Sequence, residues 1–315
     1  MAKPQTIAVI GAGLMGHGIA LTMARAGLKV AITDPVAAAR DAVLARIGES
    51  LALLDETEPA IAAILGRISV CEELERAVAE ADVVFEAAPE KIELKQAIFA
   101  EVERHARLDA ILASNTSVMP ITAIMGRLEN RSRALGTHWW NPPHVIPLVE
   151  VIRTEWTDET VVETMMTLLA DAGKTPVRVA RDVPGFIGNR LQHALWREAI
   201  SLVERGICDA ASVDTVIKSC FGRRLSVLGP LENADLVGID LTLDIHSQVL
   251  ADLESRPGPS PLLTEMIAEG RLGMKSGSGF YDWTPEKAAR LRARVTTHLR
   301  RLEDILEDEE IPPPA

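Results

Sequence analysis

A histidine and a glutamate flank an apolar stretch of unusual composition, which reads GTHWWNPPHVIPLVEV from Gly136 to Val151. A histidine can take a proton from a reacting hydroxyl, and a carboxylate on its other ring nitrogen fixes the tautomer and stabilises the imidazolium. His138 and Glu150 could form such a couple, since apolar surroundings exclude water and strengthen the interaction. An isolated pair of this kind is more often a buried histidine and a solvated strand-edge glutamate, so the catalytic interpretation depends on the other motifs.

A glycine motif near the start of the sequence has the pattern of a dinucleotide-binding turn. GAGLMG matches GxGxxG, follows the strand-like run TIAVI and opens a helical segment, and Asp34 ends the next strand-like run. Gly11 would allow the tight turn, Gly13 the approach of a pyrophosphate to helix amides, and Gly16 close helix–strand packing. Asp34 would bind ribose hydroxyls and repel a 2′-phosphate, which predicts NAD over NADP; the alternative is a structural turn with a capping aspartate.

Short apolar runs alternate with helical segments over the first part of the chain. This alternation predicts an α/β Rossmann domain with a mostly parallel sheet and helices on both faces. Strands are expected within residues 6–10, 28–34, 67–74, 81–90, 110–117, 134–140, 147–152 and 175–180. Helices are expected after the glycine motif, within residues 38–67 as one or two helices broken near residues 55–59, and within residues 91–106 and 157–174. A proline-stiffened loop between neighbouring strands would then hold the histidine and the glutamate together.

The character of the sequence changes at about Asp182–Pro184 and becomes helical. Helical patterns occur within residues 185–206, 212–221, 233–253, 261–270 and 284–310. We therefore expect two domains, an NAD-binding Rossmann domain at residues 1–183 and an all-α C-terminal domain at residues 184–315.

Composition limits the class of protein. The chain is 47% hydrophobic and 25% charged, so it can bury a sizeable core, and its net charge of -12 argues against binding nucleic acid or an anionic membrane. The three cysteines, Cys71, Cys208 and Cys220, have no metal-site spacing and are expected to be idle thiols in a reducing compartment. We find no secretory signal and no apolar run near the roughly 20 residues that span a bilayer. The expectation is a cytoplasmic protein without a metal.

Five motifs occur in order along the chain: GAGLMGHGIA, SNTSVMPIT, GTHWWNPPHVIPLVEV, DVPGFIGNRL and GMKSGSGFYDW. Together they resemble the L-3-hydroxyacyl-CoA dehydrogenase family over about Thr6 to Trp283. The resemblance implies NAD-dependent oxidation of the 3-hydroxyl of a 3-hydroxyacyl-CoA or related 3-hydroxy acid to the 3-oxo product. It also implies a homodimer formed through the C-terminal domain. The chain departs from the family where Trp139-Trp140 replaces a phenylalanine pair and Pro143 adds a second proline.

The resemblance implies roles for individual residues. His138 is similar to the family's general base, with Glu150 as its partner, and Ser117 and Asn189 match groups that hydrogen-bond the reacting oxygen. Taken alone, Ser117 could cap a turn and Asn189 could cap or bridge helices. Residues expected at the cofactor are Gly11, Gly13, Leu14, Met15, Gly16, Asp34, Glu90, Lys95 and Asn115. Residues expected at the substrate are Ser117, Asn141, Asn189, Arg223 and Arg224.

The form of the substrate stays open between a CoA thioester and a free acid. The 3′-phosphate of CoA usually binds lysine or arginine, and residues 38–67 contain no lysine and three arginines among acidic residues. The segment that carries Arg223 and Arg224 is longer than in members that act on CoA esters. It is more similar to relatives that oxidise free carboxylate-bearing substrates, such as L-gulonate, L-carnitine and pyridine-carboxylate dehydrogenases. One of the two arginines would bind the carboxylate; the alternative is a pair of surface charges.

Other classes of dinucleotide-binding protein fit the sequence less well. Dehydrogenases of the 6-phosphogluconate and 3-hydroxyisobutyrate type use a lysine in the helix that leaves the Rossmann domain, and no lysine lies between Pro184 and Ile217. A non-catalytic dinucleotide-binding or structural protein is disfavoured because the base, its partner and both oxygen-binding residues occur in one chain.

Overall fold

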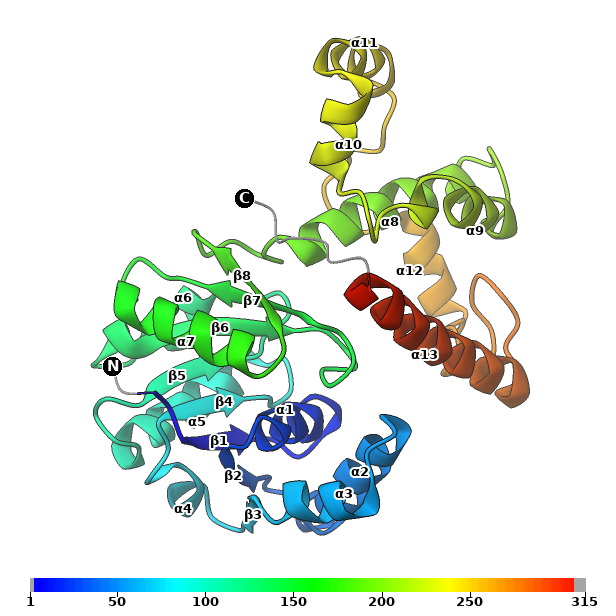
Figure 1. Ribbon diagram of the computed structural model, residues 1–315. Helices are drawn as coiled ribbons and strands as arrows, with labels where there is room; N and C mark the ends of the chain where they lie inside the picture. Colours follow the sequence, from blue (N-terminus) through cyan, green and yellow to red (C-terminus); the bar gives the residue numbers. More distant parts are fainter. Residues whose placement is uncertain (1–2, 309–315) are drawn as a thin grey trace. The chain divides into compact units, whose positions relative to one another are not determined.

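The computed structural model describes residues 3–308, and the chain divides into two compact units, residues 1–190 and 191–315 (Figure 1). The division between residues 183 and 184 expected from sequence lies inside the first unit. It falls in the segment between the strand β8 (Thr175–Val179) and the helix α8 (Gly188–Glu204), whose first residues belong to the first unit.

In residues 3–308 the first unit contains one eight-stranded sheet. Its strands are β1 (Thr6–Ile10), β2 (Lys29–Thr33), β3 (Ile68–Cys71), β4 (Val83–Glu86), β5 (Ile111–Ser114), β6 (Ala134–Trp139), β7 (Leu148–Ile152) and β8 (Thr175–Val179). The order across the sheet is β3-β2-β1-β4-β5-β6-β7-β8. Neighbouring strands are parallel except β6 and β7, which are antiparallel. The predicted mostly parallel sheet is confirmed.

Helices cover both faces of this sheet, as the sequence predicted. They are α1 (Leu14–Arg25), α2 (Ala37–Leu53), α3 (Glu58–Leu65), α4 (Leu74–Val78), α5 (Ile92–His105), α6 (Ile121–Met125), the short 3-10 helix η1 (Arg131–Arg133) and α7 (Glu159–Asp171). Successive residues of a strand point to opposite faces. In β1, Ile7 and Val9 belong to a core with residues of α1, α2 and α7, whereas Ala8 and Ile10 belong to a core with residues of α4, α5 and α6. The sheet is therefore buried on both sides.

The break expected near residues 55–59 is present between α2 and α3. The side chain of Thr57 caps α3 by accepting a hydrogen bond from the amide of Ala60 at 3.4 Å, and Pro59 occupies the first turn.

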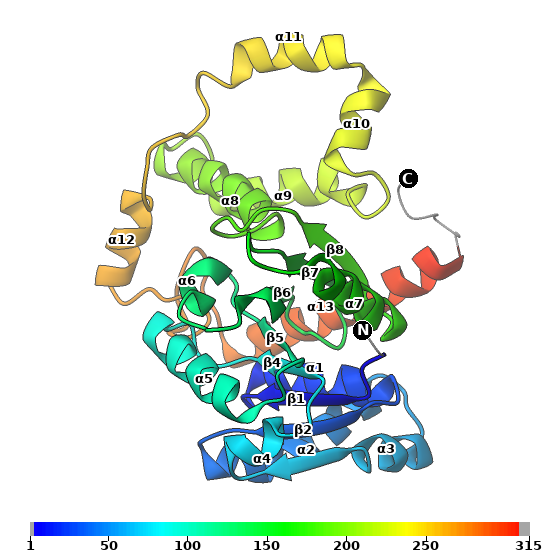
Figure 2. The ribbon, with the colours of Figure 1, turned by 90° about the vertical axis from the view of Figure 1, so that its left-hand side faces the viewer.

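The described part of the second unit is helical. Its elements are the rest of α8 (Gly188–Glu204), α9 (Ala210–Ser219), η2 (Phe221–Arg223), α10 (Pro230–Val237), α11 (Ile239–Val249), α12 (Pro261–Ala268) and α13 (Pro285–Asp308). The helical pattern expected over residues 233–253 is divided at Gly238, whose φ of 102° no helix interior adopts. Figures 1 and 2 show the resulting pair α10 and α11, in yellow, extending from the other helices of this unit.

Among residues 3–308 no helix has both the length and the apolar character needed to cross a lipid bilayer.

Candidate active site

The turn between β1 and α1 combines two glycines required by packing with one that faces open space. Gly11 has a φ of 106°, and a Cβ there would lie 2.7 Å from the carbonyl oxygen of Ala87. A Cβ on Gly16 would lie 1.7 Å from the carbonyl oxygen of Gly11. At Gly13, which precedes the first residue of α1, a Cβ would have no protein atom within 4 Å. The amino end of α1, with Leu14 and Met15 in its first turn, is thus open to an anion, as a dinucleotide pyrophosphate requires.

Asp34 lies beside this turn, directly after β2. Its carboxylate accepts hydrogen bonds from the amides of Ala12 at 2.8 Å and Val36 at 2.9 Å. The guanidinium of Arg46 donates to the carbonyl of Ala12 at 2.8 Å. Carboxylate oxygens can accept further hydrogen bonds, so Asp34 fits the ribose-binding role expected from sequence.

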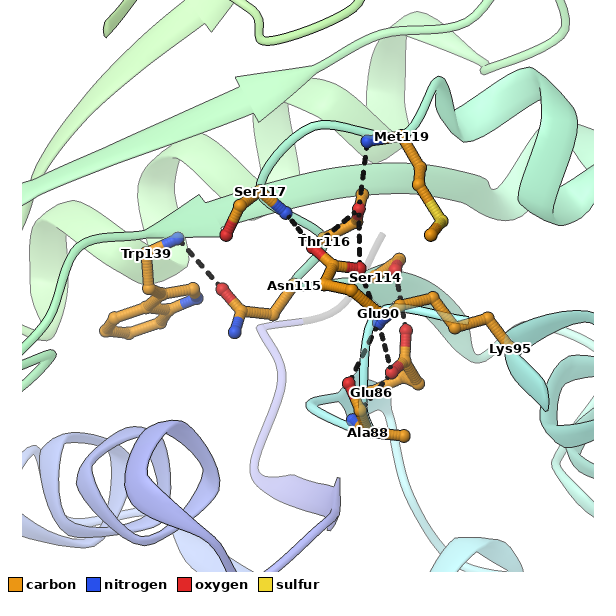
Figure 3. Close-up of polar contacts among 10 residues, drawn as sticks. All are labelled: Glu86, Ala88, Glu90, Lys95, Ser114, Asn115, Thr116, Ser117, Met119 and Trp139. Carbon is orange, nitrogen blue, oxygen red and sulfur yellow. Dashed lines mark hydrogen bonds and ion pairs between the residues drawn. The ribbon is translucent and has the colours of Figure 1, made fainter. Parts of the chain in front are cut away.

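The segment SNTS begins at Ser114, the last residue of β5, and makes a dense set of hydrogen bonds (Figure 3). The hydroxyl of Thr116 donates to the carboxylate of Glu90 at 3.0 Å, and the amide of Ser117 donates to the same carboxylate. Thr116 also accepts from the amide of Met119 at 3.1 Å, so it caps the turn. The side-chain oxygen of Asn115 accepts from the amide of Trp139 at 3.0 Å and ties β5 to β6.

A buried ion pair that was not predicted from sequence contacts Ser114, the first residue of this segment. Lys95 Nζ lies 2.7 Å from Glu86 Oε1, and both side chains are 0% exposed. Lys95 also donates to the carbonyl of Ala88 at 3.2 Å and lies 3.5 Å from Glu90 Oε2. Lys95, which is expected at the cofactor, thus contacts three protein groups, and its place at the cofactor stays a prediction.

His138 and Glu150 are directly paired residues of the antiparallel strands β6 and β7. His138 Nδ1 lies 2.7 Å from Glu150 Oε2, and the residues are 3% and 1% exposed. Glu150 Oε1 accepts from the amides of Ile187 at 2.8 Å and Gly188 at 3.0 Å. Burial is the largest single influence and raises the pKa of the Glu150 carboxyl, but the bonds from His138 and the two amides outweigh it and hold the pKa below 4.5. The couple expected from sequence is thus formed, and its carboxylate is kept ionised.

Aromatic side chains enclose the imidazole. The ring centroid of His138 lies 5.0 Å from that of Trp140 and 5.7 Å from that of Phe186. A Cβ on Gly188 would lie 2.4 Å from Trp140, so the backbone of α8 approaches this indole closely. The two-residue bend at Gly185 and Phe186, both with positive φ, aims the following amides at Glu150.

Ser117 and Asn189 are brought together. The side-chain amide of Asn189 donates to the carbonyl of Ser117 at 2.7 Å, and Asn189 follows Gly188, whose amide bonds Glu150. The four residues expected to act on the substrate hydroxyl are therefore linked by hydrogen bonds and by chain continuity within the first unit.

Other expected site residues do not join this group in the described contacts. Asn141 is exposed on the loop between β6 and β7. Arg223 and Arg224 are exposed residues of the second unit, and their substrate role stays a prediction. Among the described residues no cluster of three or more histidine, cysteine, aspartate or glutamate side chains could hold a metal.

Sequence reasoning missed Glu86 and the amides of Ile187 and Gly188. Glu86 ends β4, a central strand, and a carboxylate at the carboxyl end of a buried parallel strand followed nine residues later by a lysine was the available signal. The backbone amides leave no side-chain signal in a sequence.

Two further histidines, His17 and His144, join the β6–β7 loop to α1. The rings of His17 and His144 lie 5.6 Å apart, and the Nδ1 atom of His17 lies 3.0 Å from the carbonyl of Gly13. Burial lowers the pKa of His144 to about 4, and the nearby His17 and Lys174 add to the effect. Burial likewise lowers the pKa of His17. Both rings are therefore held neutral.

Two domain families match the chain. The NAD-binding domain of 3-hydroxyacyl-CoA dehydrogenase matches residues 6–183, and the C-terminal domain of 3-hydroxyacyl-CoA dehydrogenase matches residues 185–283. These matches confirm the resemblance noted in the motifs.

Similar proteins include enzymes of both substrate types. The chain is 36% identical over 307 residues to 5-formyl-3-hydroxy-2-methylpyridine 4-carboxylate 5-dehydrogenase of Mesorhizobium japonicum, covering 97% of this chain and 99% of that protein. It is 39% identical over 282 residues to a probable 3-hydroxybutyryl-CoA dehydrogenase of Bacillus subtilis, covering 88% of this chain and 96% of that protein. A crystal structure of 5-formyl-3-hydroxy-2-methylpyridine 4-carboxylic acid 5-dehydrogenase, an NAD+-dependent dismutase, matches with a TM-score of 0.90 and 36% identity over 96% of this chain and 98% of that one.

The nucleotide-binding turn, the histidine–glutamate couple and these likenesses agree, and the chain belongs to the 3-hydroxyacyl-CoA dehydrogenase family of NAD-dependent dehydrogenases.

Proposed function

We propose that the protein oxidises a CH–OH group with His138 as general base and Glu150 as the residue that orients it. The observation that carries the proposal is the 2.7 Å contact between His138 Nδ1 and Glu150 Oε2. A carboxylate in that position accepts a hydrogen bond from Nδ1–H, so the lone pair of the neutral imidazole is on Nε2. In the forward reaction Nε2 takes the hydroxyl proton, and the Glu150 carboxylate stabilises the imidazolium that forms.

The open amino end of α1 and the carboxylate of Asp34 would hold NAD. When bound, NAD would accept the hydride from the carbon that carries the substrate hydroxyl. The Asp34 carboxylate supports a preference for NAD over NADP, because a 2′-phosphate there would face a negative charge. Trp140 and Phe186, whose ring centroids lie 5.0 and 5.7 Å from that of the imidazole, would exclude water from the reacting centre. Their role is to strengthen the histidine–glutamate interaction by lowering the local dielectric.

Ser117 and Asn189 are proposed to hydrogen-bond the substrate oxygen. The hydroxyl of Ser117 and the side-chain amide of Asn189 can each donate a hydrogen bond. They lie close together, since the side-chain amide of Asn189 already contacts the backbone carbonyl of Ser117. Two donors on one oxygen favour the developing charge of the carbonyl-like transition state.

The substrate that we favour is a small molecule with a free carboxylate. The match to the Mesorhizobium protein supports this, because it extends over 97% of the chain and that protein is named for a formyl-pyridine carboxylate. A 3-hydroxyacyl-CoA is the second candidate, supported by the Bacillus relative, and it would place the protein in fatty acid metabolism. Arg223 and Arg224 are the groups proposed to bind the free carboxylate.

Absorbance at 340 nm tests the function and separates the two substrates. NAD is mixed in turn with a 3-hydroxyacyl-CoA, a panel of free hydroxy acids, and pyridine carboxylates that carry a hydroxymethyl or formyl group. NADH formation with a panel member supports the proposal, and no NADH formation with any of them contradicts it. Replacing Arg223 or Arg224 by Met should raise KM far more for a free acid than for a thioester; an unchanged KM for both rejects the arginine assignment.

We further propose a homodimer formed through the helical unit. Both α10 and α11 contain no buried residue, yet they carry large apolar side chains such as Leu231, Leu236 and Leu243, which are 81%, 73% and 66% exposed. An apolar surface of this kind marks an interface. Light scattering after gel filtration should give twice the 34.1 kDa chain mass, and Leu243→Glu should shift it toward the monomer. A wild-type monomer at micromolar concentration would contradict the proposal.

The proposed location is the cytoplasm. Cys71, Cys208 and Cys220 are all free, which fits a compartment that keeps thiols reduced.

A further inference from the structure

The buried ion pair of Glu86 and Lys95 needs an explanation other than stability. Glu86 ends the central strand β4 and Lys95 lies on α5, and both side chains are fully buried. Removing two charges from water costs several kcal/mol per ion, and apolar residues of similar volume are often as stable or more stable in such a place. A buried pair of this kind therefore indicates which segments are held in position; it does not indicate a gain in the free energy of folding.

Each polar atom of the pair fixes a different segment of the chain. Glu86 Oε1 accepts from Lys95 Nζ and from the amide of Ala88, each at 2.7 Å, and Glu86 Oε2 accepts from the hydroxyl of Ser114 at 2.6 Å. Lys95 Nζ returns a hydrogen bond to the carbonyl of Ala88 at 3.2 Å. The pair thus joins the ends of β4 and β5, the loop after β4, and α5, as Figure 3 shows.

The remaining contact of Lys95 leads to the proposed substrate site. Lys95 Nζ lies 3.5 Å from Glu90 Oε2, and the Glu90 side chain is 37% exposed. The other bonds of that carboxylate come from the hydroxyl of Thr116 and the amide of Ser117. Lys95 attracts Glu90 from the buried side, so its position determines where Glu90 holds the backbone of Ser117.

We propose that Glu86 and Lys95 are positioning residues, which act through Glu90 to fix Ser117 beside Asn189. Neither touches substrate. This inference rests on the proposed function only in giving Ser117 a role in turnover; the control of the Ser117 segment by the ion pair stands separately. An error of about 1 Å in a group that contacts the reacting oxygen can lower the rate by about 10²-fold.

The test removes both charges at nearly constant volume in the double variant Glu86→Gln with Lys95→Met. The Gln side chain can still accept from the Ala88 amide and contact Ser114, so the double variant should stay folded, which thermal unfolding checks. The expected effect on turnover is a fall in kcat of at least tenfold. Hydrogen exchange of the amides in residues 116–119 should become at least tenfold faster.

A second, partly buried ion pair provides the control. Arg133 is 3% exposed and lies 3.8 Å from Glu103, whose side chain is 18% exposed. Arg133 also contacts the carbonyls of Arg107 and Ala110 at the opposite ends of the strands. Arg133→Met with Glu103→Gln should leave kcat and the exchange of residues 116–119 unchanged. If the control lowers kcat as much as the test variant, the effect is general loss of structure and the positioning role is rejected.

The outcomes separate the two proposals. If wild type turns over and the double variant keeps kcat within twofold, the positioning role is wrong and the proposed function stands. If wild type oxidises no substrate of the panel, the proposed function fails, and the positioning role is then decided by amide exchange in residues 116–119 of the double variant. Faster exchange than in wild type supports the control of the Ser117 segment by the ion pair, and unchanged exchange overturns it. Should the double variant not fold, Ser114→Ala removes one bond to Glu86 and should lower kcat about threefold; no change in kcat or exchange overturns the role.

Discussion

Nδ1 of His138 and Oε2 of Glu150 lie 2.7 Å apart because the two residues face each other across the only antiparallel strand pair found within residues 3–308 of the sheet. The second carboxylate oxygen is held by two backbone amides. The carboxylate therefore cannot rotate without losing three hydrogen bonds, and it holds the imidazole in one tautomer.

Glu150→Gln should lower kcat by about 10²- to 10⁴-fold with little loss of folding stability. The amides of Ile187 and Gly188 select the carbonyl oxygen of the new side chain, so its NH2 group must face His138. An NH2 group there donates to Nδ1 and moves the ring proton to Nε2, which removes the base. Steady-state kinetics at 340 nm measures the effect, and a kcat within threefold of wild type would show that the couple does not act as proposed.

Gly13→Ala should weaken NADH binding without loss of folding stability, whereas Gly16→Ala should lower folding stability. A Cβ at Gly13 meets no protein atom within 4 Å, so the variant should fold normally and raise the Kd for NADH at least tenfold by filling the pyrophosphate space. A Cβ at Gly16 would lie 1.7 Å from a backbone oxygen, so that variant should lose about 3 kcal/mol of stability. Thermal unfolding and NADH fluorescence titration distinguish them; unaltered NADH binding by folded Gly13→Ala argues against the cofactor site.

The two neutral histidines predict a loss of stability in mild acid. The pKa of His144 falls from 6.5 in the unfolded chain to about 4 in the folded one, so the unfolded state binds the proton first. Unfolding free energy should therefore decrease as pH falls from about 6.5 to about 4, by about 3 kcal/mol when the transition is complete. The effect is absent above pH 6.5, where both states are neutral.

Urea unfolding at several pH values measures this slope. His144→Gln should make the slope shallower, whereas His298→Gln, at an exposed position, should leave it unchanged. Equal slopes for wild type and His144→Gln would assign the acid sensitivity to other groups, among them His17, whose pKa burial also lowers.

Much of the fold was predictable because the signals are local. Runs such as Thr6–Ile10 are apolar at all positions after the first, as a strand buried on both faces requires, and each is bounded by glycine or polar residues. The break at Gly238 was not predicted, since a single glycine inside a helical pattern costs only about 1 kcal/mol and only its backbone angle reveals the turn.

The site was predictable as a set of residues and less so as a geometry. Sequence placed His138 and Glu150 on neighbouring strands, but a slip of one residue would turn the glutamate to the other face, so their register needed the structure. Glu86 lies within a predicted strand, but its function is not predictable from sequence, because it depends on Lys95 and Ser114, which meet it only in the folded chain.

The central claim is that His138 takes the substrate proton, and His138→Gln tests it most directly. The measurement is the rate of NADH formation at 340 nm by the variant with the best substrate of the panel, alongside the Kd for NADH. The account predicts that turnover falls by about 10²- to 10⁴-fold while the Kd stays within threefold of wild type. Turnover within threefold of wild type would contradict it and assign the base to another residue.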